Sequence, residues 1–184
     1  MVGNFLGDFV KGSRLENLPV DIKQGVLLHR TIDSFTDSHP LVTSLKSKFP
    51  RHLRRMSGVV IDVYFDYLLC TYWREYSEQA LETVLTAFYA DLSANNLVIS
   101  NRFNHVKHGL LTHEWLIDYE HKDGCIRAFY QIEQRLNGRI EFAQYANDFL
   151  DNNHQLLEQT FIQFYPALIK YVNTTVMNAK LQRC

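Results

Sequence analysis

The chain has 184 residues, of which 46% are hydrophobic and 21% are charged, and its formal net charge is −1. This composition is typical of one soluble globular domain, here spanning residues 1–184, with ample length for a hydrophobic core. The near-neutral charge gives no general attraction to nucleic acid or to a membrane surface. We therefore expect neither as a partner, and the sequence leaves the oligomeric state open.

The cysteines and the N-terminal residues bear on where the protein works. The three cysteines, at positions 70, 125 and 184, are far apart and include no C-x-x-C pair. This pattern argues against a disulfide framework and against a thiolate zinc site. The opening MVGNFLGDFVKG is too short and too acidic for a signal peptide. We expect a cytoplasmic protein.

Helical periodicity recurs along the chain, and prolines at 19, 40, 50 and 166 separate the periodic segments. No segment alternates between apolar and polar residues for long enough to predict a strand, and LVIS at 97–100 is the only short candidate. Pro166 is expected to break the last long helix. The predicted fold class is all-α, with helices over 21–37, 41–48, 57–76, 78–92, 103–121, 123–136, 140–164 and 167–180.

The predicted helix over 57–76 contains the clearest pointer to a functional site. Its only charged residues before Trp73 are Asp62 and Asp66, whose spacing of four places them on one face of a helix. Apolar residues occupy every side of this segment, which predicts a buried helix. Two buried carboxylates are costly unless a cation meets them. That cation is either an arginine of the preceding RHLRR stretch or a metal ion.

A second group of candidate ligands lies in LLHRTIDSFTD, where His29, Asp33 and Asp37 follow one another at intervals of four. His29 and Asp33 lie on or next to the apolar arc of the predicted helix, whereas Asp37 drifts to its edge. A lone histidine on an apolar face is usually a core residue, but an imidazole with nearby carboxylates suits Mn²⁺, Fe²⁺, Zn²⁺ or Mg²⁺. Asp8 in NFLGDFVKG is a further single acid, and most such residues are solvated.

Basic residues gather just before the carboxylate helix. Lys46 and Lys48 are followed by three arginines in PRHLRRMSG, namely Arg51, Arg54 and Arg55. Such a cluster is usually a solvated face. The alternative is a surface that docks an anion or an acidic protein, which the position directly before the carboxylate helix favours.

Several segments resemble the acyl carrier protein phosphodiesterases, also called ACP hydrolases. The combination of HRxID…TD with a following D-x-x-x-D helix is fairly specific to that family. The matching segments fall in order along nearly the whole chain: GNFLGDFVKG (3–12), LPVDIKQGVLLHRTIDSFTDSHP (18–40), RRMSGVVIDVYFDYLLCTYW (54–73), HEWLIDYEHKDGC (113–125) and FIQFYPAL (161–168).

The resemblance implies an all-α helical bundle akin to the HD-domain metal phosphohydrolases. It also implies an enzyme with an Mn²⁺-type cofactor that serves fatty acid biosynthesis. The implied reaction is hydrolysis of the phosphodiester that joins 4′-phosphopantetheine to a serine of holo acyl carrier protein. The site positions carried onto this sequence are Asp8, His29, Asp33, Asp62 and Asp66.

We predict specific roles for these residues. Asp8, His29, Asp33 and Asp66 would bind one divalent cation, first of all Mn²⁺, with Mg²⁺ or Fe²⁺ as alternatives. The metal would lower the pKa of a bound water that attacks phosphorus. Asp33 and Asp62 are the predicted catalytic residues, Asp62 as an orienting residue or a general base. The predicted binding residues for the acidic carrier protein, or for its phosphate, are Arg51, Arg54 and Arg55.

The chain departs from the family pattern in two places. Members usually begin earlier, with a short apolar helix that carries a histidine, and we expect that segment to be missing here. They also commonly have a histidine directly after the second aspartate of the carboxylate helix, where this chain has Tyr67. Two alternatives therefore stay open. One is a catalytically impaired helical module that binds acyl carrier protein, and the other is an HD-type phosphohydrolase that acts on a nucleotide.

Overall fold

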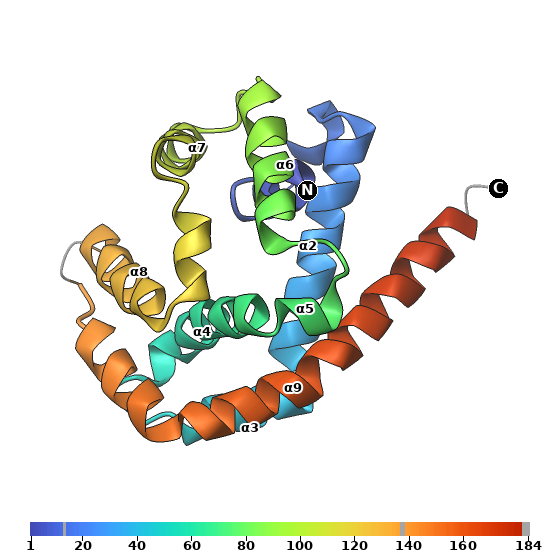
Figure 1. Cartoon of the computed structure of the whole chain (residues 1–184). Coiled ribbons are helices and arrows are strands. Elements are labelled where there is room, and N and C mark those ends of the chain that lie inside the picture. The colour runs from blue at the N-terminus through green and yellow to red at the C-terminus, as the bar shows by residue number, and fades with distance from the viewer. Residues whose placement is uncertain (13, 137–138, 182–184) are drawn as a thin grey trace. The chain divides into compact units, whose positions relative to one another are not determined.

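The computed structural model describes residues 1–12, 14–136 and 139–181, and the regular elements within them are helices (Figure 1). This confirms the predicted all-α class. No strand forms among the described residues, and the candidate at 97–100 has no regular structure. The α-helices are α1 (Val2–Phe5), α2 (Val20–Ser38), α3 (Pro40–Lys48), α4 (Ser57–Thr71), α5 (Trp73–Tyr76), α6 (Leu81–Ala94), α7 (Asn101–His113), α8 (Lys122–Arg135) and α9 (Ala143–Leu181).

Four short 3₁₀ helices join these elements, and two of the predicted helices are divided. The segment predicted over 57–76 is interrupted at Tyr72, between α4 and α5. The segment predicted over 103–121 is interrupted at Glu114, whose φ of 47° is left-handed and ends α7. The 3₁₀ helices are η1 (Leu6–Asp8), η2 (Arg14–Asn17), η3 (Arg54–Met56) and η4 (Trp115–Glu120).

The prediction that Pro166 ends a helix is wrong, because α9 runs through it without interruption (Figure 1). A proline inside a helix removes one backbone hydrogen bond and crowds the preceding turn. Packing on both sides outweighs that cost here. Phe161 and Phe164 are buried in the turns before the proline. After it, the ring of Tyr171 stacks on Phe35 with centroids 4.3 Å apart.

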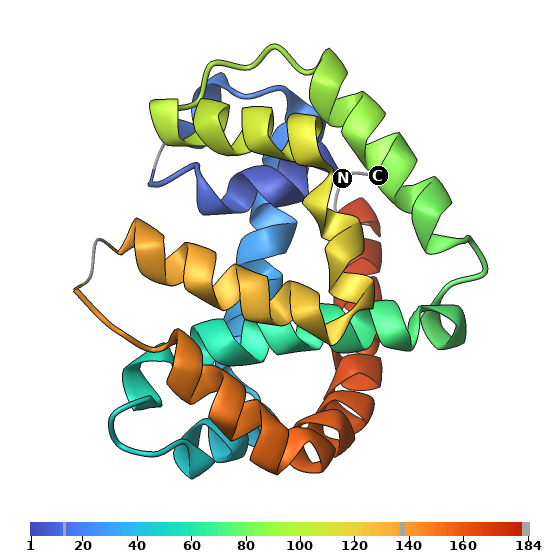
Figure 2. The ribbon, with the colours of Figure 1, turned by 60° about the vertical axis from the view of Figure 1, so that its left-hand side comes forward.

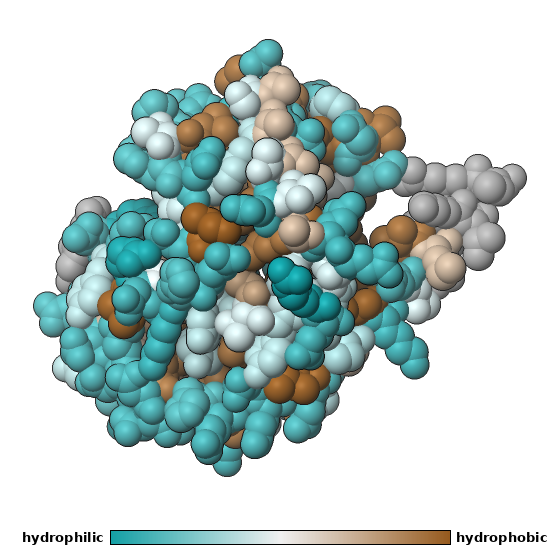
Figure 3. Space-filling view, in the orientation of Figure 1, coloured by the Kyte–Doolittle hydropathy of each residue, from teal (hydrophilic) through white to brown (hydrophobic). Residues whose placement is uncertain are grey.

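The helices form two compact units, each made from two chain segments. The first unit joins Met1–Ser34 to Arg74–Ile117, and the second joins Phe35–Trp73 to the described residues from Asp118 onward. The prediction of one domain over 1–184 stays a prediction. Among the described residues, no helix is both long enough and apolar enough to span a lipid bilayer. Hydrophilic side chains cover much of the face shown in Figure 3.

The first unit has its own core, in which α1 packs against α6 and α6 against α7. Four phenylalanines dominate it. Phe5 contacts the rings of Phe9, Phe88 and Phe103 at centroid distances of 5.3, 5.6 and 6.3 Å. Tilted and edge-on aromatic pairs of this kind add to the stabilisation that comes from burial. The buried members of this core are Val2, Leu6, Val10, Ile22, Val26, Phe88, Leu92, Phe103 and Leu110.

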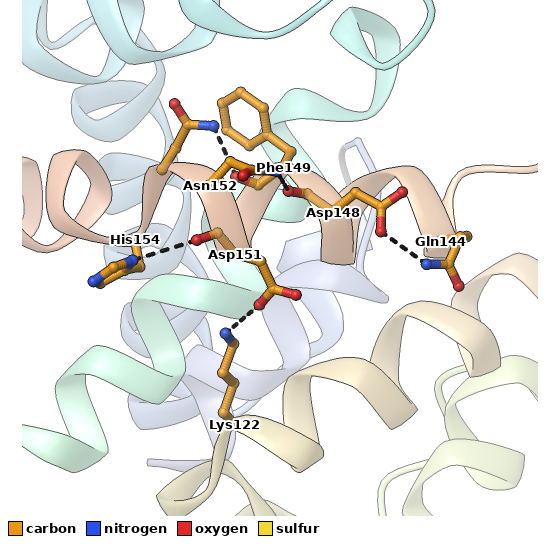
Figure 4. A network of polar contacts seen from close by, with 8 residues as sticks. Lys122, Gln144, Asp148, Phe149, Asp151, Asn152 and His154 are labelled. Carbon is orange, nitrogen blue, oxygen red and sulfur yellow. Dashed lines mark hydrogen bonds and ion pairs between the residues drawn. The ribbon is translucent and has the colours of Figure 1, made fainter.

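The second unit is organised around α4, which packs against α8 and α9, while α3 lies along α9. Figure 2 shows α8 beside α4. Two contacts tie α8 to α9. The Glu133 carboxylate accepts hydrogen bonds from the backbone N–H groups of Phe142 and Ala143, at the start of α9. Lys122 pairs with Asp151 on the polar face of α9 (Figure 4).

Candidate functional site

The site in the first unit depends on a close approach between α1 and α2. A Cβ atom on Gly3 would lie 2.6 Å from the Ile22 carbonyl oxygen, and one on Gly25 would lie 2.6 Å from the Gly3 backbone. Real Cβ atoms do not come so close, so the two helices touch through bare backbone at these glycines. This contact brings the turn that follows α1, with Asp8 at its end, onto the side of α2 that carries His29.

His29 lies between two carboxylates. Its Nε2 atom is 3.5 Å from Asp8 Oδ1 and 3.0 Å from Asp33 Oδ2. The His29 side chain is 17% exposed, whereas those of Asp8 and Asp33 are 65% and 57% exposed. The imidazole ring packs against Gly7, where a Cβ would lie 2.1 Å from the ring. The imidazole of the cluster is therefore packed against the protein, while its two carboxylates are open to solvent.

The two acids favour a protonated imidazole. The pKa of His29 is raised, mainly by its hydrogen bond with Asp8 and further by the charges of Asp33 and Asp8, against the effect of burial and of Arg30. The pKa of Asp8 is lowered, mainly by the same hydrogen bond, against burial and with help from the charges of His29 and Arg102. Asp8 and His29 therefore stabilise each other's charged form.

We expect Asp8→Asn to bring the pKa of His29 down toward its ordinary value of 6.5, because the amide carries no charge. The raised pKa stabilises the folded state below pH ~6.5, and this contribution is lost as pH rises through the folded-state value. Asp8→Asn should therefore make the free energy of unfolding less dependent on pH in this range. NMR titration of the imidazole measures the shift. Asp21→Asn, an exposed acid in the first turn of α2, is the matched control, and a His29 pKa that moves equally in both variants would contradict the assignment.

The donor types in this cluster fit a divalent cation. Adjacent ligands around an octahedral ion with bonds of ~2.1 Å lie about 3 Å apart, which is close to the two separations from His29 Nε2. Within the described residues, however, no group of three or more His, Cys, Asp or Glu residues stands ready to hold a metal ion. An ion would also have to displace the Nε2 proton. The ligand types fit, but the three residues do not form a preassembled site.

Asp62 and Asp66 lie in the second unit, and the prediction that they are buried is wrong. Both are exposed residues of α4. The helix buries a different set of side chains: Ser57, Val60, Ile61, Val63, Tyr64, Phe65 and Leu68. The predicted desolvation cost therefore does not arise. The prediction that Asp66 shares a metal ion with His29, and that Asp62 is catalytic, stays a prediction.

Asp66 nevertheless influences buried and half-buried neighbours in its unit. Burial raises the pKa of the Cys70 thiol and that of the Cys125 thiol to about 12 each, and the charge of Asp66 adds to both shifts. Burial also raises the pKa of Tyr119, again with help from Asp66. Tyr67, which follows Asp66, is half-buried, and its ring is 5.4 Å from that of Tyr64.

The three predicted partner-binding arginines are exposed around η3 and directly precede α4. Lys46, a fourth member of the basic cluster, is engaged within the unit, because its Nζ lies 2.7 Å from Asp37 Oδ1. This pair also places Asp37 in an ion pair of the second unit. The arginines available to a partner in this cluster are Arg51, Arg54 and Arg55.

Comparison with known proteins adds to this geometry. The profile of the acyl carrier protein phosphodiesterase family matches residues 1–168. The chain belongs to this family. The predicted membership is thereby confirmed, and the family name is that of a hydrolase.

Curated acyl carrier protein phosphodiesterases resemble the chain over most of its length. The protein of Enterobacter sp. (strain 638) is 29% identical over 168 residues, which cover 91% of this chain and 86% of that protein. The protein of Escherichia coli O6:H1 is 30% identical, covering 91% and 87%. That of Pectobacterium atrosepticum is 27% identical, covering 95% and 90%. No solved structure matches the chain, so the likeness to the HD-domain fold stays a prediction.

The sequence analysis did not identify two arginines that lie near the His29 cluster. Arg30 Nη2 donates a hydrogen bond to the Val10 carbonyl oxygen over 2.9 Å, which fastens the segment after η1 to α2. Arg102, in the first turn of α7, is close enough for its charge to help lower the pKa of Asp8. Arg30 directly follows His29 in the sequence, so its position near the cluster could have been expected. Arg102 is far away in sequence, so no spacing could have indicated it.

Proposed function

We propose that this protein is a phosphodiesterase that hydrolyses holo acyl carrier protein to apo acyl carrier protein and 4′-phosphopantetheine. Family membership supports the substrate class. The observation that carries the proposal is the His29 imidazole held between the carboxylates of Asp8 and Asp33 at a solvent-accessible edge of the first unit. The free thiols Cys70 and Cys125 suit a reducing cytoplasm, where we place the reaction.

Hydrolysis of this phosphodiester needs a base that takes a proton from the attacking water and then returns a proton to the departing serine oxygen. Asp33, which is exposed and adjacent to the imidazole, suits both tasks. Asp8, whose Oδ1 lies 3.5 Å from the same Nε2 atom, helps to hold the imidazole beside Asp33. The partly buried ring is thereby kept in one orientation while its two acids face the substrate.

A divalent cation, first of all Mn²⁺ and otherwise Mg²⁺ or Fe²⁺, belongs to this proposal. Asp8, His29 and Asp33 are the residues of the first unit that would hold it. Such an ion supplies charge stabilisation to the phosphoryl oxygens and lowers the pKa of a bound water. Because it must replace the Nε2 proton, we expect its affinity to fall as pH drops below the raised pKa of His29.

The direct test is incubation of the purified protein with holo acyl carrier protein, with and without added Mn²⁺, followed by mass spectrometry of the carrier protein. Loss of the phosphopantetheine group supports the proposal. Tight binding of the carrier protein without turnover would instead select an impaired binding module, for which Tyr67 is the motivating residue. Turnover of a nucleotide panel, with holo carrier protein left intact, would select a nucleotide phosphohydrolase.

The exposed arginines are proposed to dock the acidic carrier protein. We expect Arg54→Ala to raise KM for holo acyl carrier protein by roughly fivefold at low salt with little change in kcat, because a charge at the edge of an interface acts on encounter rather than on chemistry. Steady-state kinetics at two ionic strengths measures this. Arg139→Ala, another exposed arginine of the second unit, is the control. A KM insensitive to both salt and Arg54 would contradict the docking proposal.

A further inference from the structure

Arg102 is exposed next to the His29 cluster, and the ring of Phe9 supports it. The guanidinium carbon of Arg102 lies 5.5 Å from the centroid of the Phe9 ring. Phe9 directly follows Asp8. Its ring is itself packed, with centroid distances of 5.3 Å to Phe5 and 5.5 Å to Phe103. The guanidinium therefore rests on a ring that belongs to the core of the first unit.

The chemistry of this contact leaves the Arg102 donors available. The cation–π contact with Phe9 uses no hydrogen-bond acceptor, and the guanidinium has five N–H groups that can donate hydrogen bonds. Among the described residues, no carboxylate lies within salt-bridge distance of Arg102. Arg30, the other arginine near the cluster, is half-buried and already donates to the Val10 carbonyl oxygen.

The charge balance of the cluster calls for such a residue. The cluster presents the carboxylates of Asp8 and Asp33 to solvent, and their negative charge repels an anionic phosphodiester. Arg102 lies close enough to Asp8 to act on it electrostatically, and its positive charge offsets part of that repulsion. A planar guanidinium also matches the geometry of two phosphate oxygens, which a point charge does not.

We propose that Arg102 is the phosphate-binding residue of this site, donating hydrogen bonds to the non-bridging oxygens of the substrate phosphodiester. The assignment of a phosphodiester rests on the proposed function. The contact with Phe9 restricts the Arg102 side chain before the substrate arrives, so less side-chain freedom is lost on binding. Arg102 then holds the phosphate group of the substrate beside Asp8 and His29.

Direct binding tests this inference without relying on turnover. Inorganic phosphate and 4′-phosphopantetheine are titrated into the whole protein, with binding followed by NMR shifts of the His29 and Phe9 rings. We expect Arg102→Gln to weaken the binding of both probes about tenfold or more, and Arg102→Lys to weaken it less. Arg74→Gln, which removes the charge of another exposed arginine of the first unit, should leave it unchanged. Equal phosphate affinity in Arg102→Gln and wild type would overturn the inference.

Kinetics separates this inference from the proposed function. With holo acyl carrier protein, Arg102→Gln should lower kcat/KM about a hundredfold, and Arg102→Lys should recover part of the loss. If the wild type binds phosphate through Arg102 but leaves holo carrier protein intact, the inference stands and the proposed function fails. If the wild type turns over and Arg102→Gln retains its kcat/KM and phosphate affinity, the inference alone fails. Circular dichroism melting confirms that the variants are folded.

Discussion

Replacement of His29 with alanine is expected to lower kcat for release of 4′-phosphopantetheine by about a hundredfold or more. The imidazole contacts both Asp8 and Asp33, at 3.5 and 3.0 Å. Removing it disconnects the two acids and removes the nitrogen ligand that a metal ion would need. Loss of a positioned acid–base group or of a metal ligand costs factors of this size. Mass spectrometry of the carrier protein under single-turnover conditions measures the effect.

His105→Ala is the matched control, because this histidine is exposed on α7 of the same unit. Its kcat should equal that of the wild type. Retention of full activity in His29→Ala would refute the site assignment. Asp66→Ala tests whether Asp66 is a metal ligand together with the residues of the first unit. If it retains both wild-type activity and wild-type Mn²⁺ affinity, the predicted role of Asp66 as a metal ligand is wrong, and the residues of the first unit act without it.

Gly25→Ala should both destabilise the protein and impair its site. The new Cβ would lie 2.6 Å from backbone atoms of Gly3 and Asn4, which cannot move aside as a flexible side chain can. Forcing an atom into a packed contact costs about 1–3 kcal/mol. α1 must then move away from α2, and Asp8 moves with it. We expect activity to fall about tenfold or more, because displacements of about 1 Å can reduce rates by factors up to about a hundred. Denaturant unfolding and kinetics measure the two effects.

Gly58→Ala provides the matched control for this change. Gly58 also lies in a helix, but the nearest atom to a Cβ there is Lys46 Cε, at 4.0 Å. Gly58→Ala should therefore leave the free energy of unfolding unchanged or raise it by up to about 1 kcal/mol, because alanine has the higher helix propensity. If both variants unfold at the same denaturant concentration, the close approach of α1 and α2 does not limit stability, and the explanation for the position of Asp8 fails.

Local sequence patterns predicted the helices well where the controlling interactions are local. The periodicity after Pro19 predicted a helix over 21–37, and α2 covers Val20–Ser38. The same periodicity indicated that His29 and Asp33 share a face, and the 3.0 Å contact between them follows from that spacing. Pro166 was misleading, because the burial of Phe161 and Phe164 and the stacking of Tyr171 on Phe35 depend on residues distant in sequence.

The carboxylates of α4 show the limit of a hydrophobicity pattern. Their spacing correctly placed Asp62 and Asp66 on one face, but apolar residues on all sides of the segment suggested that this face is covered. Helix periodicity indicates which residues share a side, not which elements pack against that side. In its unit α4 packs against α8 and α9, and the side that carries the two acids is exposed.

The sequence by itself determined the all-α class, the family, and the pairing of His29 with Asp33, because helix periodicity and motif spacing are local properties of the chain. Only the tertiary structure decided that Asp8 joins that pair, since its position depends on the backbone contact between Gly3 and Gly25. The same holds for Arg102, which reaches the cluster because α7 packs into the core that holds Phe9. Contacts between distant segments depend on packing, and no spacing along the chain encodes them.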